Sequence, residues 1–252
     1  MRKTLSGKVA LVTGGSRGLG AAIAKALAEQ GADVAVSYVA ASAKAEDVVA
    51  TLRSQGVRAL AIRSDQADPG AARPLVDAVM AHFGRLDILV NNAAIAVQGK
   101  TVDHPELDTA GLDHQWRVNV LGPVAITRAA APVLSDGGRI VFIGSLLGSH
   151  VPFAGVADYA GTKAALAGYA RGVARDLGGR DITANTVQPG VMPTDMAAAV
   201  LGDGVPAALL DLHPIRRIAT LEEVAATVCF LAGPHAGYIT GSVVDVAGGL
   251  GT

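Results

Sequence analysis

Three residues carry side chains whose types and spacing suit proton transfer. Tyr159 and Lys163 lie four residues apart in D-Y-A-G-T-K, and Ser145 precedes them in I-G-S. On a helix this spacing places two side chains on one face, so we expect the Lys163 ammonium near the Tyr159 phenol, whose pKa is ordinarily about 10. A neighbouring positive charge would lower that pKa and make the phenol a usable acid near neutral pH.

Ser145 follows the apolar run 139–144, which is typical of a buried strand. A hydroxyl at the end of such a strand is well placed to meet a substrate oxygen. By itself the pattern Y-x-x-x-K also occurs on solvated helix faces, so other motifs must decide whether these residues are catalytic.

A glycine-rich turn near the N-terminus is the second motif. Residues 13–20 read T-G-G-S-R-G-L-G and separate a predicted strand from a predicted helix. Glycines permit a tight turn whose backbone N–H groups approach a pyrophosphate, and the helix N-terminus favours negative charge. This context predicts a dinucleotide site.

The end of the second predicted strand indicates which dinucleotide is bound. NAD sites usually place Asp or Glu there, about 20 residues past the glycines, whereas this chain has Ser37 in V-S-Y. Asp33 precedes the strand core and is expected to serve the preceding turn. Arg17 and Ser37 could hold a 2′-phosphate, so the prediction is NADP(H), with NAD(H) as the alternative cofactor.

Short apolar runs alternate with longer amphipathic segments, which predicts βαβ units and a parallel sheet. No linker or composition shift divides the chain, so residues 1–252 are interpreted as one domain. We expect seven strands at Val9–Thr13, Val34–Ser37, Ala59–Ile62, Ile88–Val90, Ile140–Ile143, Ile182–Val187 and Val243–Val246. The clearest helices are expected at Leu19–Gln30, Pro69–Phe83, Asp113–Leu134, Tyr159–Leu177 and Leu221–Leu231.

Residues 192–213 depart from this alternation, with two prolines, an internal G-D-G and several apolar side chains. They follow the carboxyl end of a predicted strand, where open α/β sheets place their ligands. A lid over a substrate pocket is one interpretation, and a helical excursion packed on the core is the other.

The motifs together resemble the short-chain dehydrogenase/reductase family over residues 7–249. The resemblance implies an α/β fold made of one doubly wound, Rossmann-type domain with a seven-stranded parallel sheet. The matching features are T-G-x-x-x-G-x-G at 13–20, Asp65, N-N-A at 91–93, Asn119, Ser145, Tyr159 with Lys163, and P-G-x-x-x-T at 189–194. One departure is Ala94, where the family usually has glycine; the added methyl group would crowd the backbone or fit if φ is negative.

The resemblance also implies roles for individual residues. Tyr159 would donate a proton to a carbonyl oxygen, Lys163 would bind the nicotinamide ribose and lower the Tyr159 pKa, Ser145 would orient the carbonyl, and Asn119 would hold a water that connects Lys163 to solvent. Cofactor contacts are expected from Gly14, Ser16, Arg17, Gly18, Leu19, Gly20, Ser37, Asp65, Gln66, Asn91, Ala93, Tyr159, Lys163, Pro189, Gly190, Val191 and Thr194.

Composition narrows the possible partners. The 21 basic and 22 acidic residues nearly cancel without a basic block, so no nucleic-acid partner is expected.

The short apolar run at the N-terminus does not suit a signal peptide and no segment resembles a membrane span. The one cysteine, Cys229, fits a reducing compartment, so a cytoplasmic protein is expected. Histidines lack metal-ligand spacing, and no metal site is expected.

The leading hypothesis is a reversible NADPH-dependent carbonyl reductase. Leu147, Phe153, Met192 and Met196 are expected to line its substrate pocket and favour either an apolar ketone or a 3-oxoacyl thioester. The alternative from another class is a catalytically silent, dinucleotide-binding regulatory protein, which would have no need of the proton donor. Many small residues on the predicted helix 159–177 indicate a face suited to close helix packing, and the family resemblance implies a homotetramer.

Overall fold

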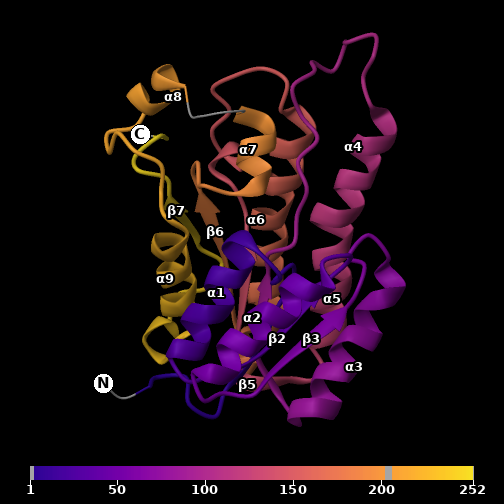
Figure 1. Cartoon of the computed structure of the whole chain (residues 1–252), viewed down its shortest axis with the longest axis vertical. Coiled ribbons are helices and arrows are strands. Elements are labelled where there is room, and N and C mark those ends of the chain that lie inside the picture. The colour runs from indigo at the N-terminus through magenta and orange to yellow at the C-terminus, as the bar shows by residue number, and fades with distance from the viewer. Residues whose placement is uncertain (1–2, 202–205, 252) are drawn as a thin grey trace.

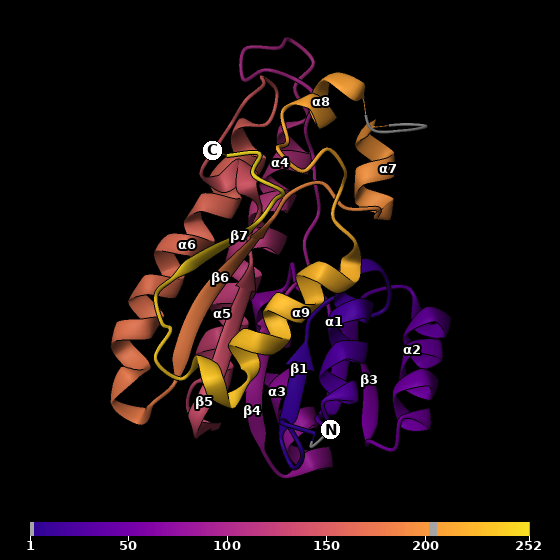
Figure 2. The same ribbon diagram turned by 90° about the vertical axis from the view of Figure 1, so that its left-hand side faces the viewer.

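Seven strands form one entirely parallel sheet in the computed structural model, which describes residues 3–201 and 206–251. In space the strands run in the order β3-β2-β1-β4-β5-β6-β7 (Figure 2). They span Val9–Val12 (β1), Asp33–Tyr38 (β2), Ala59–Arg63 (β3), Leu86–Asn91 (β4), Leu134–Ile143 (β5), Thr183–Pro189 (β6) and Val243–Val246 (β7). The predicted doubly wound α/β fold with seven parallel strands is confirmed.

Helices cover both faces of this sheet (Figure 1). Helices α1, α2 and α9 pack on one face, and α3, α5 and α6 pack on the other, each around its own buried apolar cluster. Because both faces are covered, β1 and residues 140–143 of β5 are continuous apolar runs. The helices span Gly18–Glu29 (α1), Ser42–Ser54 (α2), Ala72–Phe83 (α3), Thr109–Trp116 (α4), Gly122–Ala130 (α5), Ala157–Leu177 (α6), Asp195–Leu201 (α7), Ala207–Asp211 (α8) and Leu221–Ala232 (α9).

The single helix predicted at Asp113–Leu134 is wrong in its course and its end. Helix α4 passes into a π-helical segment at Arg117–Leu121 before α5 begins. Pro123 lacks a backbone N–H, so the ladder must adjust just ahead of it. Pro132 then prevents the helix from continuing, and Leu134 instead pairs with Leu86 as the first residue of β5.

The carboxyl ends of the strands meet at one edge of the sheet. Strand β1 lies between β2 and β4, so the chain reverses there the direction in which it adds strands. In open α/β sheets this reversal leaves a crevice in which ligands bind. Helices α7 and α8, from the predicted lid at 192–213, lie at the same end of the molecule (Figure 1); residues 202–205 of that segment lie outside the described residues.

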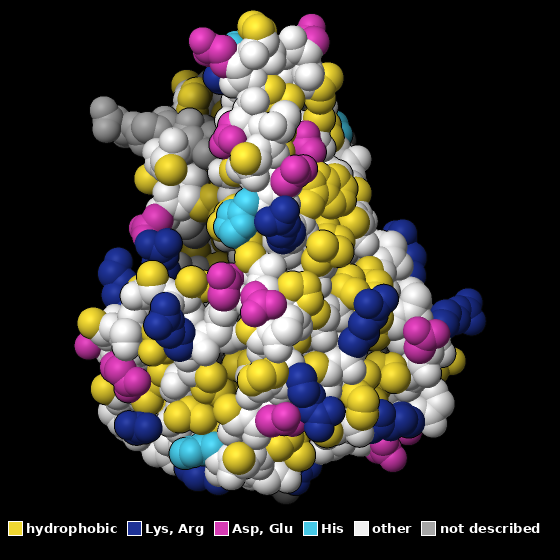
Figure 3. Space-filling view, turned by 90° about the vertical axis from the view of Figure 1, so that its right-hand side faces the viewer, with side chains coloured by type: hydrophobic (Ala, Val, Ile, Leu, Met, Phe, Trp, Pro, Cys, Tyr) yellow, Lys and Arg dark blue, Asp and Glu magenta, His cyan; other side chains and the backbone are white. Residues whose placement is uncertain are grey.

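The surface is mixed in charge on the side that carries α3 and α4. There, basic and acidic side chains are interspersed among apolar ones (Figure 3). In the described parts of the chain, no helix combines the length and the apolar character needed to cross a bilayer.

Candidate active site

The glycine turn after β1 is closely packed at Gly14 and Gly20. Gly14 and Gly18 have φ angles of +64° and +53°, which favour glycine. A Cβ added at Gly14 would lie 2.9 Å from Ala93, and one added at Gly20 would overlap the carbonyl oxygen of Gly14. The turn therefore exposes backbone at the start of α1 and fits the pyrophosphate of a dinucleotide.

A reciprocal hydrogen-bond clamp holds this turn against the loop after β4. The Thr13 hydroxyl accepts from the backbone N–H groups of Asn92 and Ala93, both at 3.0 Å. The Asn92 amide in turn donates to the carbonyl oxygens of Thr13 at 2.8 Å and Gly14 at 3.2 Å. The two strand ends thus form one rigid wall at the reversal point of the sheet.

A cleft of about 700 Å³ opens at this point. It brings together most of the residues that the sequence suggested. Its walls include Gly14, Ser16, Arg17, Gly18, Leu19, Gly20, Ser37, Asp65, Gln66, Ala93, Ser145, Tyr159, Lys163, Pro189, Gly190, Met192, Thr194 and Met196.

Lys163 and Tyr159 lie side by side at the base of the cleft. The Lys163 Nζ is 5.6 Å from the centroid of the Tyr159 ring and donates a 3.0 Å hydrogen bond to the carbonyl oxygen of Ile143. Burial lowers the pKa of the Lys163 ammonium to about 8, because a charged group loses its hydration there.

The Tyr159 pKa moves in the opposite direction from the one expected. Burial raises it to about 12, and a hydrogen bond with Ser145 offsets only part of this effect. The Ser145 hydroxyl also accepts from the backbone N–H of Leu147 at 3.2 Å. In the protein alone, desolvation of the phenol therefore outweighs the hydrogen bond with Ser145, and Tyr159 keeps its proton at neutral pH.

Asn119 lies in the π-helical segment and joins three parts of the site. Its side chain accepts from the backbone N–H of Ile95 at 2.9 Å and donates to the Ile95 carbonyl at 2.9 Å. The same amide donates to Thr162 of α6 at 3.2 Å, and the Thr162 hydroxyl donates to the Tyr159 carbonyl at 2.7 Å. A π-turn inserts an extra residue in a helix. Here the π-turn contains Asn119, whose side chain links Ile95 to Thr162.

Five sequence-predicted site residues lie outside the cleft walls. Asn91 is buried in β4, and its amide donates to Thr127 of α5 at 3.2 Å. Asn119 is buried behind the wall, as described above. The carbonyl oxygen of Val191 accepts from the backbone N–H of Ala219 at 3.0 Å. The backbone N–H of Leu147 donates to the Ser145 hydroxyl. Phe153 is 46 % exposed.

Other lining residues escaped the sequence reasoning. Asn92, rather than Asn91, reaches the cleft from the N-N-A motif, because Asn91 still belongs to the strand and faces a helix layer. The period-two alternation of strand side chains was the signal that could have separated these two residues. Further lining residues are Tyr38, Val39, Ala40, Ala41, Ser64, Ala94, Ile95, His114, Val118, Ile143, Gly144 and Asp195.

The added methyl group of Ala94 is accommodated without backbone strain. Among the described residues, Asp181 is the non-glycine residue with positive φ. Ala94 therefore does not adopt the left-handed conformation that would require glycine, so the departure from N-N-A-G introduces no backbone strain there.

The carboxyl end of β2 carries no carboxylate toward the cleft. Asp33, at the other end of this strand, accepts from the backbone N–H of Arg58 at 2.7 Å and from its guanidinium at 2.8 Å. The Ser37 hydroxyl accepts from the Gly14 N–H at 3.3 Å, so it also braces the glycine turn. Arg17 forms an ion pair of 3.0 Å with Asp195.

Cys229 packs against the apolar cluster beneath α1 and α9. Burial raises the pKa of its thiol to about 12, which opposes a role as a nucleophile. Within residues 3–201 and 206–251, no group of three or more His, Cys, Asp or Glu side chains is arranged to hold a metal ion.

The fold, the glycine turn and the cleft define a Rossmann-type protein. Comparisons with known proteins identify the family within this fold class. A family model described as enoyl-(acyl carrier protein) reductase matches residues 14–251. A cyclic-di-GMP-binding biofilm dispersal mediator protein of Escherichia coli is 41% identical over 246 residues, covering 98% of both chains. A 3-oxoacyl-(acyl-carrier-protein) reductase of Staphylococcus aureus is 38% identical, covering 96% of this chain and 98% of the relative.

Two solved structures superpose with a TM-score of 0.93, and each match covers 99% of this chain and 100% of the other. One is a short-chain dehydrogenase from Burkholderia cenocepacia in complex with NADP, at 47% identity. The other is a blue fluorescent protein from a metagenomic library in complex with NADPH, at 42% identity. The chain belongs to the short-chain dehydrogenase/reductase family.

Proposed function

We propose that the protein is an NADP(H)-dependent oxidoreductase that reversibly reduces a carbonyl group to an alcohol. The observation that carries this proposal is the meeting of Ser145, Tyr159 and Lys163 in the cleft that the glycine turn also lines. A dinucleotide-binding regulator would need the glycine turn alone. A buried phenol that retains its proton beside a buried ammonium serves proton transfer.

The residues present suit NADP(H). The side-chain-free turn at Gly14 and Gly18 leaves space for a pyrophosphate against the start of α1. Arg17 supplies a guanidinium for a 2′-phosphate, and Ser37 stands where a carboxylate would repel one. The NADP and NADPH complexes of the two similar structures support this choice over NAD(H).

The bound cofactor supplies a hydride to the carbonyl carbon, and the protein supplies the proton and the orientation. Ser145 donates a hydrogen bond to the carbonyl oxygen, which gains negative charge as the reaction proceeds. Tyr159 gives its proton to this oxygen, so that the product is a neutral alcohol. Lys163 holds the ribose hydroxyls and lies close enough to Tyr159 to stabilise the phenolate that remains. In the reverse reaction Tyr159 takes the proton back.

Asn119 is proposed as the residue that maintains this arrangement. Its bonds to Ile95 and Thr162 tie the cleft wall to the helix that carries Tyr159 and Lys163. It lies beside the Thr162 hydroxyl within the buried interior, a position from which it could also hold a water that leads protons toward Lys163.

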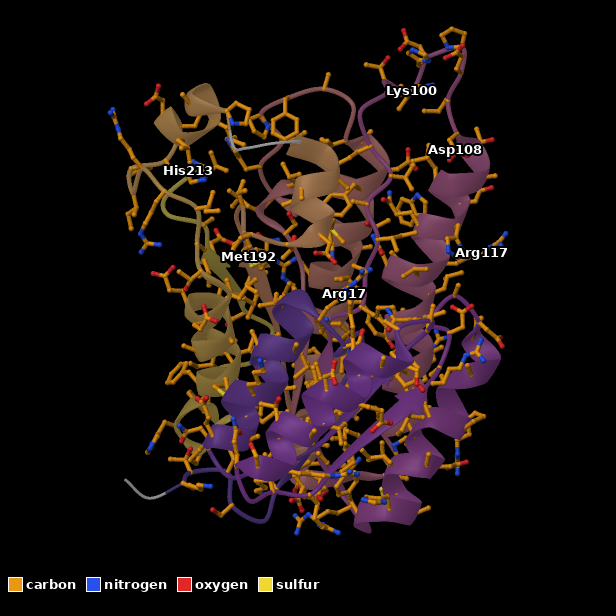
Figure 4. All side chains as sticks on the ribbon, viewed as in Figure 1. Arg17, Lys100, Asp108, Arg117, Met192 and His213 are labelled. Carbon is orange, nitrogen blue, oxygen red and sulfur yellow. The ribbon has the colours of Figure 1, made fainter. Side chains whose placement is uncertain are left out.

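The substrate is proposed to be largely apolar. Met192 and Met196 line the cleft, and Met192, labelled in Figure 4, also packs against the core. The described parts of the segment 192–213, residues 192–201 and 206–213, are proposed to cover the bound substrate, with Leu147 and Phe153 contributing to the same pocket. A 3-oxoacyl thioester and a free apolar ketone both fit this description.

The test is turnover of NADPH and NADH with a panel of free ketones and 3-oxoacyl thioesters, with Tyr159→Phe as the inactive control. We expect oxidation of NADPH by at least one member of the panel and almost none in the variant. Tight binding of NADPH without turnover of any member would instead favour a regulatory protein. Turnover that persists in the variant would remove Tyr159 from the mechanism.

We propose further that the chain forms a homotetramer in the cytoplasm. On α6, a Cβ added at Gly168 or Gly172 would meet nothing within 4 Å, so this helix presents a surface that a second helix could approach closely. The mass of the particle in light scattering tests the assembly: about four times 25.3 kDa is expected, and a monomer would contradict it.

A further inference from the structure

An ion pair joins the two walls of the cleft. The Arg17 guanidinium, from the glycine turn, lies 3.0 Å from the carboxylate of Asp195, the first residue of α7. The two residues are 178 positions apart in the chain. Both residues line the cleft, and Figure 4 labels Arg17, so the pair links the glycine turn to α7 beside the proposed cofactor site.

The local charges explain why Arg17 attracts an anion here. Arg17 precedes α1, which has no acidic residue in its first turn and no side chain capping its N-terminus. The guanidinium therefore lies at the positive end of the α1 dipole. Among the described residues, the carboxylate that pairs with the Arg17 guanidinium is that of Asp195.

Asp195 is held in place from its own helix. Thr194 caps α7, since its hydroxyl accepts from the backbone N–H of Ala197 at 3.1 Å. The carboxylate at the start of α7 is stabilised by the positive end of that helix, and it points back to Arg17. The side chains of Arg17 and Asp195 are 62% and 69% exposed, so an incoming anion can reach the guanidinium.

We propose that Asp195 is a specificity residue that competes with the cofactor for Arg17. Without cofactor, its carboxylate occupies the guanidinium and tethers α7 to the glycine turn. The 2′-phosphate of NADP(H) displaces it, whereas NAD(H), which lacks this phosphate, leaves the pair intact. Asp195 therefore lowers the affinity for NADP(H) alone and couples release of α7 to binding of that cofactor. This inference rests on the proposed role of Arg17.

The experiment measures dissociation constants of NADPH and NADH for the native protein, Asp195→Asn and Asp211→Asn. Asparagine keeps the size of Asp195 and removes its charge. Because an exposed ion pair contributes little, we expect NADPH to bind about two- to fivefold more tightly to Asp195→Asn, with NADH unchanged. The gain should vanish in high salt and in an Arg17→Ala background.

Asp211→Asn is the matched control. Asp211 lies on α8 and pairs with Arg216 at 3.9 Å, so its substitution makes the same change in net charge without touching Arg17. Unchanged affinity is expected for both cofactors. If both aspartate substitutions increased the affinity for NADPH equally, the change in net charge would explain the effect, and the inference would be overturned.

Amide hydrogen exchange of residues 196–199 gives a readout that does not depend on turnover. In the cofactor-free protein, Asp195→Asn and Arg17→Ala should both accelerate exchange about two- to fivefold, and Asp211→Asn should not. If Arg17→Ala leaves the NADPH to NADH affinity ratio unchanged, the proposed phosphate site fails and the competition fails with it. If that ratio falls but Asp195→Asn changes neither affinity nor exchange, the inference alone is wrong.

Discussion

The Lys163 ammonium donates a 3.0 Å hydrogen bond to the carbonyl oxygen of Ile143, the last residue of β5. This bond anchors α6 to the strand end at which Ser145 follows. It does not compensate for burial, because the Lys163 pKa falls from 10.5 to about 8. The difference corresponds to roughly 3 kcal/mol of destabilisation by the charged form. The buried Lys163 ammonium therefore lowers the stability of the folded protein.

Lys163→Met should show this cost through its pH dependence. The folded protein releases the Lys163 proton near pH 8 and the unfolded chain near 10.5, so native stability rises with pH between these values. The free energy of unfolding of the variant minus that of the native protein should therefore fall by about 2–3 kcal/mol from pH 7 to pH 10.5.

Urea titrations at several pH values measure this difference, with Lys44→Met, an exposed lysine on α2, as the control for loss of a charge. In the folded protein Tyr159 keeps its proton up to pH 10.5, because its pKa is about 12, so its titration in the unfolded chain cancels between the native protein and both variants. A difference that does not change with pH would contradict the burial cost assigned to Lys163.

Tyr159→Phe should lower kcat for carbonyl reduction by about 10²–10⁴-fold, the usual contribution of general acid catalysis. Cofactor affinity should remain nearly unchanged, because the hydroxyl acts in the transition state. Steady-state kinetics and a cofactor titration separate the two quantities. Tyr169→Phe, on the same helix against Phe142, is the control and should retain kcat within about twofold.

Arg17→Ala should weaken NADPH by about one to two orders of magnitude, since a hydrogen bond to a charged group contributes roughly 1.5–3 kcal/mol. NADH binding should change little. Ser37→Asp should reverse the native preference, because its carboxylate repels the phosphate and accepts from free ribose hydroxyls. The values of kcat/KM for both cofactors at fixed ionic strength provide the test. Native preference for NADH would show that the phosphate is recognised elsewhere.

Asn119→Ala should destabilise the protein by about 2–4 kcal/mol, because the partly buried N–H and carbonyl of Ile95 and the buried Thr162 hydroxyl all lose a hydrogen-bond partner. Thr162→Val removes the bond from Asn119 and the bond from the Thr162 hydroxyl to the Tyr159 carbonyl, but it leaves both Ile95 bonds in place and should cost about 1–2 kcal/mol. Chemical denaturation compares the two variants. Equal losses would mean that the Ile95 bonds contribute nothing.

Gly14→Ala should impair dinucleotide binding at least tenfold and reduce stability. The added Cβ would lie 2.9 Å from Ala93 in a residue with φ of +64°. Gly56→Ala separates the two causes, since Gly56 has φ of +85° with nothing within 4 Å of the added atom. It should cost about 1–2 kcal/mol from backbone strain alone. A Gly14→Ala variant that binds NADPH normally would contradict the close approach of the turn.

Much of the fold was predictable because local patterns and tertiary structure agree. The apolar runs at Val9–Val12 and Ile140–Ile143 are short, buried and separated by amphipathic segments, so strand identity and parallel pairing follow from the pattern. The expected helix through Asp113–Leu134 failed where Pro123 and Pro132 interrupt the hydrogen-bond ladder. Helical propensity of the neighbouring residues did not reveal the π-turn at Asn119.

The sequence by itself determined which chemical groups are available: the glycines of the turn, the phenol, the ammonium and the absence of a carboxylate after β2. Tertiary structure decided what surrounds them. It turned Asn91 away from the cleft, joined Arg17 to Asp195 across 178 positions, and raised the Tyr159 pKa through burial. These outcomes depend on desolvation and on contacts between distant segments, which spacing along a single chain does not encode.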